Sequence, residues 1–257
     1  MKMKKFLSMV LVGACVLSMA ACGKKNDKVI ASVDDLKGAT IGVQQGTTGD
    51  LYTTKGFGDD YIERFNKGAE AVQALKQGKV DAVVIDNEPA KEFVKANEGL
   101  KILDTPYEEE DYALGFAKGS ELTAKFNQAI AELKADGTFD AIVAYYIEGK
   151  GERYESPADI KYTDELVMAT NAEFPPYEFY EEEEIVGIDA DFAKAIGDKL
   201  GMKIVIEDMA FDSIIPAVQS GKADFAAAGL TVTEDREKQV DFSDTYYTGV
   251  QVIIVNE

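Results

Sequence analysis

The chain has 257 residues, of which 46% are hydrophobic and 29% charged, a balance that excludes disordered and fibrous proteins. Asp and Glu number 47 against 27 Lys and Arg, so the formal net charge is -20, and most faces of the protein would repel nucleic acid or an anionic lipid surface. The chain contains no His, which excludes serine-triad mechanisms and His-ligated metal sites. We therefore expect no nucleic-acid partner.

Residues 1–21 have the composition of an export signal. A basic start precedes an apolar run over residues 6–21, which is shorter than the roughly 20 residues of a membrane-spanning helix. The end of this segment resembles a bacterial lipoprotein signal, in which small residues before a Cys direct cleavage. That resemblance implies that Cys22 becomes a lipidated first residue and that residues 22–31 form a tether. An ordinary cleavage site beside Cys22 is the alternative.

A β-α-β pattern is predicted in the first half of the chain. Residues 39–43 form an apolar run, 44–50 a Gly-rich loop, and 60–77 carry hydrophobic side chains at helical spacing. A Gly then precedes an apolar run at 82–85, which is the order expected for the second half of a β-α-β unit. A further helical stretch is predicted over 121–144.

The same order of elements returns in the second half. A helix is predicted over 191–200 and a strand over 204–206, followed by a helix over 211–220 and a buried strand over 225–228. We therefore expect an α/β fold of two similar lobes. In such folds the loops at the carboxyl ends of the strands surround a crevice, where ligands bind.

Side chains of opposite charge follow these predicted strands. Asp86 and Arg236 each come directly after a strand or its loop, and Thr48 lies where a helix N-terminus favours an anion. Arg236 offers a bidentate fork to a carboxylate, and Asp86 can accept from an ammonium. We expect Phe174 and Phe211 to line the apolar stem of the ligand. The predicted ligand is therefore a zwitterion.

Each of these residues also has a purely structural interpretation. Arg236, after a capping Thr233, would be a surface helix residue, and Asp86 would be a turn residue. The loop Gly46–Gly49 would be a tight turn. Their joint placement on one side of the predicted sheets favours the binding site.

Four stretches of the chain resemble one protein family. They are 41–52, 174–191, 211–224 and 228–247. Through them the chain resembles the polar amino acid family of bacterial extracellular solute-binding proteins, the capture subunits of ABC importers. The resemblance implies a two-lobed fold like that of type II periplasmic binding proteins, with the ligand cleft between the lobes.

The resemblance also implies roles for individual residues. Arg236 takes the carboxylate-binding position, Thr231 adds a hydroxyl contact, and Gly229 offers a backbone carbonyl to the ammonium. Thr48 donates to the carboxylate from the opposite lobe, and Asp86 binds the α-ammonium, while two aromatic rings bracket the side chain. The full set of expected ligand-binding residues is Arg236, Asp86, Thr231, Thr48, Phe174, Phe211, Gly229 and Asn171.

The identity of the ligand is less constrained. Asn171, Glu173 and Asp212 are expected near the side-chain pocket. The two acids would favour Lys or Arg as ligands, whereas Asn171 would suit glutamine or another neutral polar side chain. We expect a neutral or broad polar specificity.

The order of segments differs from that of the family. In the family the stretch 166–255 comes first and 32–144 follows it, so the resemblance implies a circular permutation, with 148–163 as the bridge. We accordingly divide the chain into lobe 2 (32–111) and lobe 1 (112–257). Lobe 1 includes a hinge strand at 112–117, helices over 121–146 and the linker 148–163. The second strand that crosses between lobes is expected to be cut, which would loosen hinge closure.

The predicted function is that of a lipid-anchored, extracytoplasmic receptor, at the cell surface or in the periplasm. It would close on a free amino acid and deliver it to an ABC transporter permease, and we expect it to be a monomer, not an enzyme, and to need no cofactor. An enzyme on the same fold, such as a dehydratase, and an amino acid sensor domain are the alternatives.

Two acidic features are expected to be structural. The run Glu181–Glu184 is assigned to a solvated hairpin tip, and Asp191 is assigned to a helix cap rather than to a calcium loop. The sequence has no Walker-type or GxGxxG motif, so nucleotide binding has no support.

Overall fold

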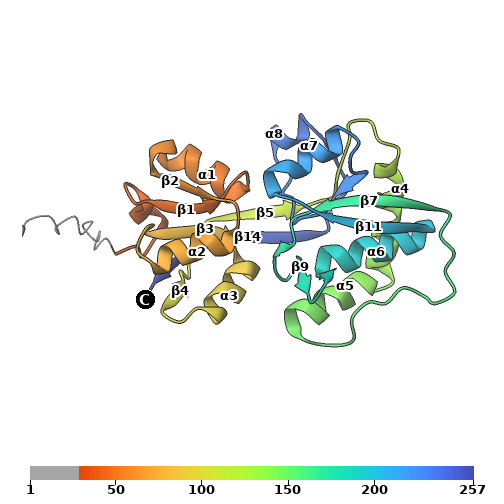
Figure 1. The fold of residues 1–257 in the computed structure, drawn as a ribbon, viewed down its shortest axis with the longest axis horizontal. Helices are drawn as coiled ribbons and strands as arrows, with labels where there is room; N and C mark the ends of the chain where they lie inside the picture. The colour runs from red at the N-terminus through yellow and green to blue at the C-terminus, as the bar shows by residue number, and fades with distance from the viewer. Residues whose placement is uncertain (1–28) are drawn as a thin grey trace, which may run out of the picture.

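The structure is a computed structural model that describes residues 29–257. Two lobes lie side by side, and two crossing segments of the chain connect them (Figure 1). In the part of the chain that is described, no helix is long and apolar enough to cross a membrane. The predicted export signal 1–21 and the predicted lipidation site Cys22 lie outside the described residues.

Lobe 2 is built on a six-stranded sheet in the order β2-β1-β3-β14-β4, with β5 also paired to β14. Its strands β1, β2 and β3 are parallel, whereas β14 runs antiparallel to β3, β4 and β5. The strands are β1 (Ile41–Gln44), β2 (Ile62–Phe65), β3 (Ala82–Asp86), β4 (Leu100–Ile102), β5 (Glu108–Tyr112) and β14 (Tyr247–Asn256). The helices are α1 (Thr48–Phe57), α2 (Gly68–Lys76) and α3 (Asn87–Ala96).

Lobe 1 is built on a five-stranded sheet in the order β11-β7-β12-β6-β13. These strands are β6 (Gly115–Phe116), β7 (Asp164–Thr170), β11 (Met202–Asp208), β12 (Phe225–Ala226) and β13 (Asp241–Phe242). The helices are α4 (Leu122–Ala135), α5 (Thr138–Val143), α6 (Ile188–Leu200), α7 (Ile214–Gln219) and α8 (Glu234–Glu237). A small antiparallel sheet holds β8 (Glu173–Phe174), β9 (Glu178–Glu181) and β10 (Glu184–Val186). The predicted α/β class is confirmed.

One predicted helix is wrong. The stretch 60–77 contains strand β2, which pairs in parallel with β1, and only then helix α2. Ile62 is buried and the strand ends before a short turn at Asn66 and Lys67, so the apparent helical spacing came from joining two elements. The helical region 121–144 is likewise two helices, divided at Gly137, whose φ of 82° interrupts helical geometry.

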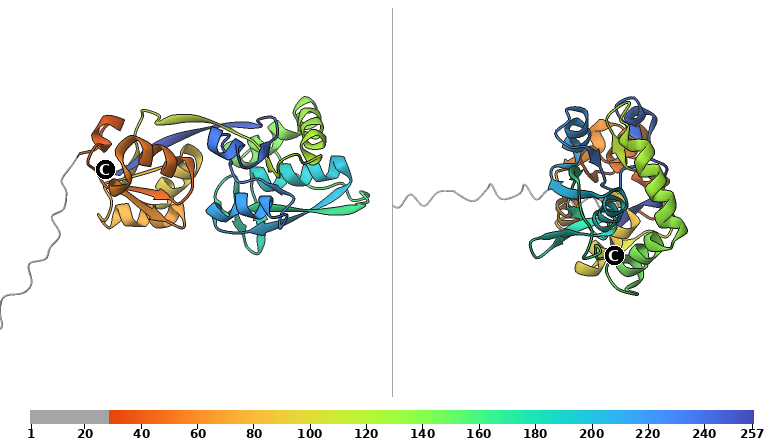
Figure 2. Two further views of the ribbon diagram at one scale, coloured as in Figure 1. Left: turned by 90° about the horizontal axis from the view of Figure 1, so that it is seen from above. Right: turned by 90° about the vertical axis from the view of Figure 1, so that its right-hand side faces the viewer.

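The second crossing between lobes is intact, which corrects the expectation that it is cut. Strand β14 starts beside Tyr112 and continues into the sheet of lobe 2, where Gln251 to Ile254 pair with β3. Figure 2 shows β5 and β14 running together from one lobe to the other. Residues 247–256 therefore belong to the sheet of lobe 2, not to lobe 1, and the hinge has two hydrogen-bonded strands.

Each lobe has its own hydrophobic core, and the two ends of the described chain meet in one of them. Ile30 and Val255 are buried in the same cluster of lobe 2 as Ile41 and Val84. The core of lobe 1 includes Phe192 of α6. Chain ends that lie close together are common in domains that tolerate rearranged connectivity.

The linker 148–163 is fastened to helix α6. Arg153 binds the buried carboxylate of Asp191 at 2.9 Å, and it also binds Glu184 at 2.8 Å. Tyr154 donates to Asp198 at 2.7 Å. Asp191 therefore serves as an ion-pair partner and not as the expected helix cap, because the helix starts earlier, after Gly187. The run Glu181–Glu184 forms the predicted hairpin tip.

Candidate functional site

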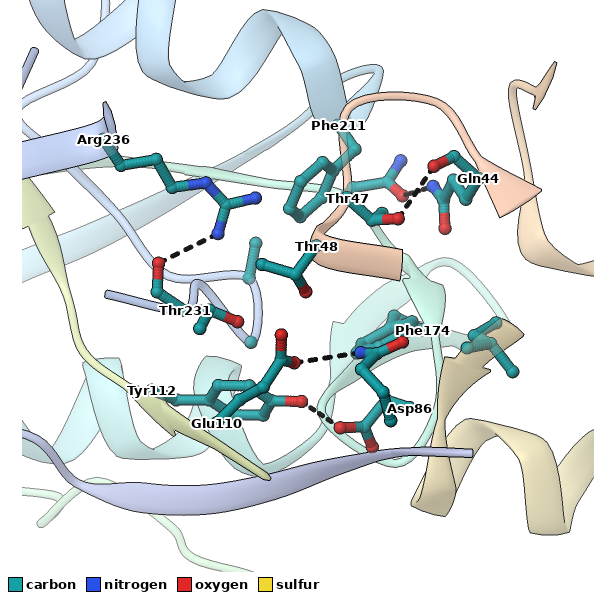
Figure 3. Close-up of a pocket in the computed structure, with 15 residues that line it drawn as sticks. Gln44, Thr47, Thr48, Asp86, Glu110, Tyr112, Phe174, Phe211, Thr231 and Arg236 are labelled. Carbon is teal, nitrogen blue, oxygen red and sulfur yellow. Dashed lines mark hydrogen bonds between the residues drawn. The ribbon is translucent and has the colours of Figure 1, made fainter. Parts of the chain in front are cut away.

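A cavity lies between the lobes and contains all eight of the expected binding residues (Figure 3). The space that atoms leave empty there is about 390 Å³, counting the part that opens to solvent. Its lining consists of Gln44, Thr47, Thr48, Ile85, Asp86, Glu110, Tyr112, Asn171, Phe174, Phe211, Ala228, Gly229, Thr231, Arg236 and Gln251.

Arg236 is held in place by backbone groups. It lies in the short helix α8, whose capping residue Thr233 accepts a hydrogen bond from the Arg236 amide at 3.2 Å. The guanidinium donates to the backbone oxygen of Thr231 at 2.9 Å and to that of Gly46, in the opposite lobe, at 3.2 Å. Its central carbon lies 5.5 Å from the centre of the Phe211 ring, in range for a cation–π contact.

The charge of Arg236 has no direct counter-charge. The side chain is only 4% exposed, and within residues 29–257 no carboxylate forms an ion pair or hydrogen bond with it. Burial lowers the pKa of Arg236 to about 10, so it still carries its charge at neutral pH. A buried cation of this kind needs an anionic partner.

The N-terminus of helix α1 faces the same cavity from lobe 2. Thr47 caps the helix by accepting from the Asp50 amide, and Thr48 is the first helical residue and is buried. Backbone N–H groups at such a terminus are free to bind an anion. The Asp50 carboxylate forms an ion pair with Arg64, at 2.9 Å. The anion site therefore combines Arg236 of lobe 1 with the start of α1 in lobe 2.

Asp86 ends strand β3 and is fully buried. One carboxylate oxygen accepts from the Tyr112 hydroxyl and the other from the Glu88 amide at 3.1 Å. Burial raises the pKa of Asp86 to about 7, against the lowering effect of these two hydrogen bonds. Asp86 thus titrates near neutral pH, and a nearby cation would favour its ionised form.

Gly229 and Phe174 form one wall of the cavity. Gly229 has a φ of 51°, and a Cβ atom at this position would lie 3.1 Å from the Phe174 ring. The Gly229 amide donates to the buried carboxylate of Asp189 at 2.7 Å. Phe174 stacks on Tyr177 with ring centres 5.6 Å apart. Both the backbone conformation and the close ring favour glycine here.

The two lobes touch through polar side chains around the cavity. Asn171 accepts from the Gln44 amide at 2.8 Å in a buried hydrogen bond, and its own amide nitrogen donates to the backbone of Met209. Nearer the surface, Gln45 donates to Asp212 at 2.8 Å. Lys67 and Glu173 form an ion pair across the lobes, with 2.5 Å between Nζ and Oε1. The lobes are therefore in contact, and the buried Gln44–Asn171 hydrogen bond connects them.

Sequence reasoning missed several lining residues, of which Glu110 is the most polar. It lies in an acidic run on β5, which by composition alone indicates a solvated edge. Burial on this strand alternates, however, so that Glu110 and Tyr112 are buried and Glu109 and Asp111 are exposed. The period of two residues in a strand is the signal that could have placed Glu110 beside Tyr112.

No metal centre is present in the described part of the chain, since no three His, Cys, Asp or Glu side chains gather there in a way that could hold an ion. The polar groups of the cavity instead suit an organic ion with separate negative and positive ends. Arg236 and the start of α1 can hold the negative end, and buried carboxylates can receive the positive end.

Part of the chain matches the sequence model of a known protein family. The model of the family described as "Bacterial extracellular solute-binding proteins, family 3" matches residues 166–257. Through these residues, the chain belongs to that family. The match includes Phe174, Phe211 and Arg236 of the cavity.

Individual relatives match the chain over similar lengths. The arginine-binding extracellular protein ArtP of Bacillus subtilis (strain 168) is 45% identical over 89 residues, which are 35% of each chain. A probable histidine-binding protein of Neisseria gonorrhoeae is 37% identical over 89 residues, 34% of this chain and 33% of the relative. Among solved structures, an ancestral arginine-binding protein bound to arginine is 55% identical, with 32% of this chain and 37% of that chain covered and a TM-score of 0.32. The chain thus spans about a third of the length of the curated relatives it matches.

Proposed function

We propose that this chain captures a free polar amino acid between its lobes and delivers it to the permease of an ABC importer. The observation that carries the proposal is the buried Arg236, which faces the start of helix α1 and has no carboxylate partner within residues 29–257. The α-carboxylate of an amino acid would supply that counter-charge. Asp86 and the Gly229 backbone line the same cavity and would receive the ammonium. The matched relatives are named as binding proteins for amino acids, which supports a binding role rather than catalysis.

Closure of the lobes would couple binding to delivery. A ligand between Arg236 and Thr48 touches both lobes only when they are closed, so it binds the closed form more tightly and shifts the population toward it. The two crossing strands β5 and β14 supply the hinge. The Gln44–Asn171 hydrogen bond would add to the stability of the closed form.

The side-chain pocket supports a broad polar specificity. The Asn171 amide is already bonded on both sides, to Gln44 and to Met209. Two acids at the rim, Glu173 and Asp212, each bind a side chain of the opposite lobe. None of these three groups is left free to select one side chain. We therefore propose that arginine and neutral polar amino acids compete for the site.

The location and the segment order are also proposals. We propose that the protein is extracytoplasmic, monomeric and anchored by a lipid on Cys22, as the pattern of residues 1–22 predicts. We further propose that the segments are circularly permuted relative to the family. The burial of Ile30 and Val255 in one hydrophobic cluster and the ion pair of Arg153 with Asp191 of α6 support this connectivity. Incorporation of a labelled fatty acid that is lost in Cys22→Ala would test the anchor.

Isothermal titration calorimetry of the chain from residue 23 onward with the twenty free amino acids tests the binding proposal. We expect saturable, one-to-one binding of several polar amino acids. Arg236→Ala should weaken it by about thirtyfold or more, since truncating one partner of a buried charge pair costs about 2–5 kcal/mol. The absence of binding by any of the twenty, in a folded sample, would refute the proposed function.

A further inference from the structure

Asp189 is a buried carboxylate behind one wall of the cavity. It lies in the first turn of α6 and is 1% exposed. Its Oδ2 accepts from the Gly229 amide at 2.7 Å, and its Oδ1 accepts from the Tyr246 hydroxyl at 2.7 Å. Gly229 lines the cavity, whereas Asp189 does not. Asp189 therefore contacts the wall from its far side.

The hydrogen bond from Gly229 fixes the orientation of the peptide between Ala228 and Gly229. Both of these residues line the cavity. In a trans peptide the N–H and the C=O point in opposite directions, so an N–H directed to Asp189 turns the Ala228 carbonyl away from Asp189. Gly229 has a φ of 51°, and a glycine has more backbone freedom than any other residue. The hydrogen bond to Asp189 removes that freedom from this part of the wall.

Glu178 keeps the negative charge on Asp189. It is fully buried, and a side-chain hydrogen bond joins it to Asp189. Two ionised carboxylates in contact away from water strongly disfavour each other, so one of the two groups holds a proton. Burial raises the pKa of Glu178 well above its usual value, and it raises that of Asp189 only to about 6. Glu178 is therefore the donor, and Asp189 is the ionised acceptor at neutral pH.

Tyr246 connects Asp189 to the hinge. It directly precedes β14, and its amide donates to the backbone oxygen of Tyr112, the last residue of β5, at 2.9 Å. These two strands are the crossing segments between the lobes. The Tyr246 side chain is buried in the core of lobe 1. The Asp189 carboxylate therefore cannot rotate without breaking a buried hydrogen bond.

We propose that Asp189 is a positioning residue for the ligand cavity, which holds the Ala228–Gly229 peptide in one orientation relative to the hinge. This inference rests on the proposed function and adds a residue that acts on the ligand through the cavity wall. An ionised acceptor holds an amide more strongly than a neutral one. Without Asp189 the peptide is free to rotate, and the wall no longer has one fixed shape for a bound amino acid.

The variant Asp189→Ala tests this proposal, with Asp191→Ala as the matched control. Asp191 belongs to the same helix and is also fully buried, but it forms its ion pair with Arg153 of the linker. Both changes remove a buried carboxylate from α6, and only the first removes a partner of the cavity wall. Asp189→Asn keeps an oxygen acceptor and is the conservative variant. Each protein is titrated calorimetrically with L-arginine and with L-glutamine at pH 7.5.

Amide hydrogen exchange without ligand, followed by NMR, reports on the wall directly. In the parent the Gly229 amide should exchange as slowly as amides of the lobe 1 core. Asp189→Ala should accelerate its exchange about tenfold or more relative to those core amides, because a buried hydrogen bond to a charged group is lost. Asp191→Ala should leave this ratio unchanged.

The affinities should follow the same order. We expect Asp189→Ala to bind both amino acids about tenfold more weakly than the parent, Asp189→Asn about threefold more weakly, and Asp191→Ala within about twofold. If Asp189→Ala does not fold, Asp189→Asn carries the test. Gly229 should exchange faster in this variant than in the parent, since the acceptor has lost its charge.

Three results would overturn the inference. Rapid exchange of Gly229 in the parent, or equal exchange in the parent and Asp189→Asn, would show that Asp189 does not hold the peptide. Unchanged affinity in a folded Asp189→Ala would show that the ligand does not depend on it. Equal losses of affinity in Asp189→Ala and Asp191→Ala would indicate a general structural effect. Failure of the proposed function is distinguishable, since the parent would then bind neither amino acid, whereas the exchange measurement needs no ligand.

Discussion

The guanidinium of Arg236 in lobe 1 donates a hydrogen bond to the backbone oxygen of Gly46 in lobe 2, at 3.2 Å. Together with the bond to Thr231, this contact uses two of the five N–H groups of the side chain. The remaining donors are available for a carboxylate between the lobes. The same residue thus joins the lobes and provides the positive charge of the cavity.

Replacement of Arg236 by Lys should separate charge from geometry. Lysine keeps the positive charge but lacks the planar fork that binds a carboxylate through two parallel hydrogen bonds. We expect amino acid affinity to fall about tenfold, equivalent to about 1.4 kcal/mol. Calorimetric titration measures it, and a dissociation constant within twofold of the parent would show that the fork is not used.

The buried hydrogen bond between Gln44 and Asn171 should stabilise the closed form. Asn171→Ala removes it and leaves the Gln44 amide with only its hydrogen bond to the backbone oxygen of Asn66, and the loss of one buried hydrogen bond costs about 1 kcal/mol. We expect affinity to fall about fivefold and the radius of gyration without ligand, from small-angle X-ray scattering, to increase. Gln45→Ala is the control, because its bond to Asp212 is exposed. An equal effect of both variants would contradict a specific contribution of the Gln44–Asn171 hydrogen bond.

Affinity should depend on pH through Asp86. Burial raises the pKa of Asp86 to about 7. Below this pH the Asp86 carboxyl group is mostly protonated, and it must lose its proton before its negative charge can stabilise a bound cation. We expect affinity to increase about tenfold between pH 6 and pH 8, as the ionised fraction of Asp86 rises. Asp86→Asn should bind more weakly and with little pH dependence. A pH dependence identical to the parent's would remove Asp86 from this role.

The buried carboxyl groups of Glu178 and Asp189 should make stability fall as pH rises. Both are fully buried; neither oxygen of Glu178 has a donor in the described residues, while Asp189 accepts from Gly229 and from Tyr246. Burial raises the pKa of Glu178 well above its usual value, and the charges of Asp189, Asp86 and Asp208 raise it further. The folded state therefore holds a proton that the unfolded chain releases above about pH 4.3.

This stabilisation is complete below the unfolded pKa and is lost as pH rises toward the folded one. Glu178→Gln has no such proton to hold. Its free energy of unfolding, relative to the parent, should therefore increase by about 1.4 kcal/mol per pH unit above pH 4.5. Urea denaturation at pH 5, 6 and 7 measures this difference. Parallel pH curves for the two proteins would contradict a protonated Glu178.

Much of the cavity could be predicted because its residues follow strands. Asp86 ends β3, and the residues that precede Thr48 end β1. The carboxyl ends of these parallel strands must meet at one edge of the sheet. The sequences of these strands are short apolar runs, which the local pattern of hydrophobic residues is enough to recognise. All eight expected residues therefore lie around one cavity, although their binding roles remain predictions.

The missed features depend on tertiary pairing. Strand β2 has one buried residue, Ile62. It is a strand because β1 pairs with it, not because of its own pattern. The path of β14 into lobe 2 follows from pairing with β3 across a long sequence separation. Glu110 is buried by its neighbours on β14, although four consecutive acidic residues indicate a solvated segment.

A crystal structure of the protein with its most tightly bound amino acid tests the central claim most directly. The account predicts the ligand carboxylate within hydrogen-bond distance of Arg236 and the start of α1, and the α-ammonium directed to Asp86 and the Gly229 backbone. A ligand bound outside this cavity, or one with its ammonium toward Arg236, would contradict the account.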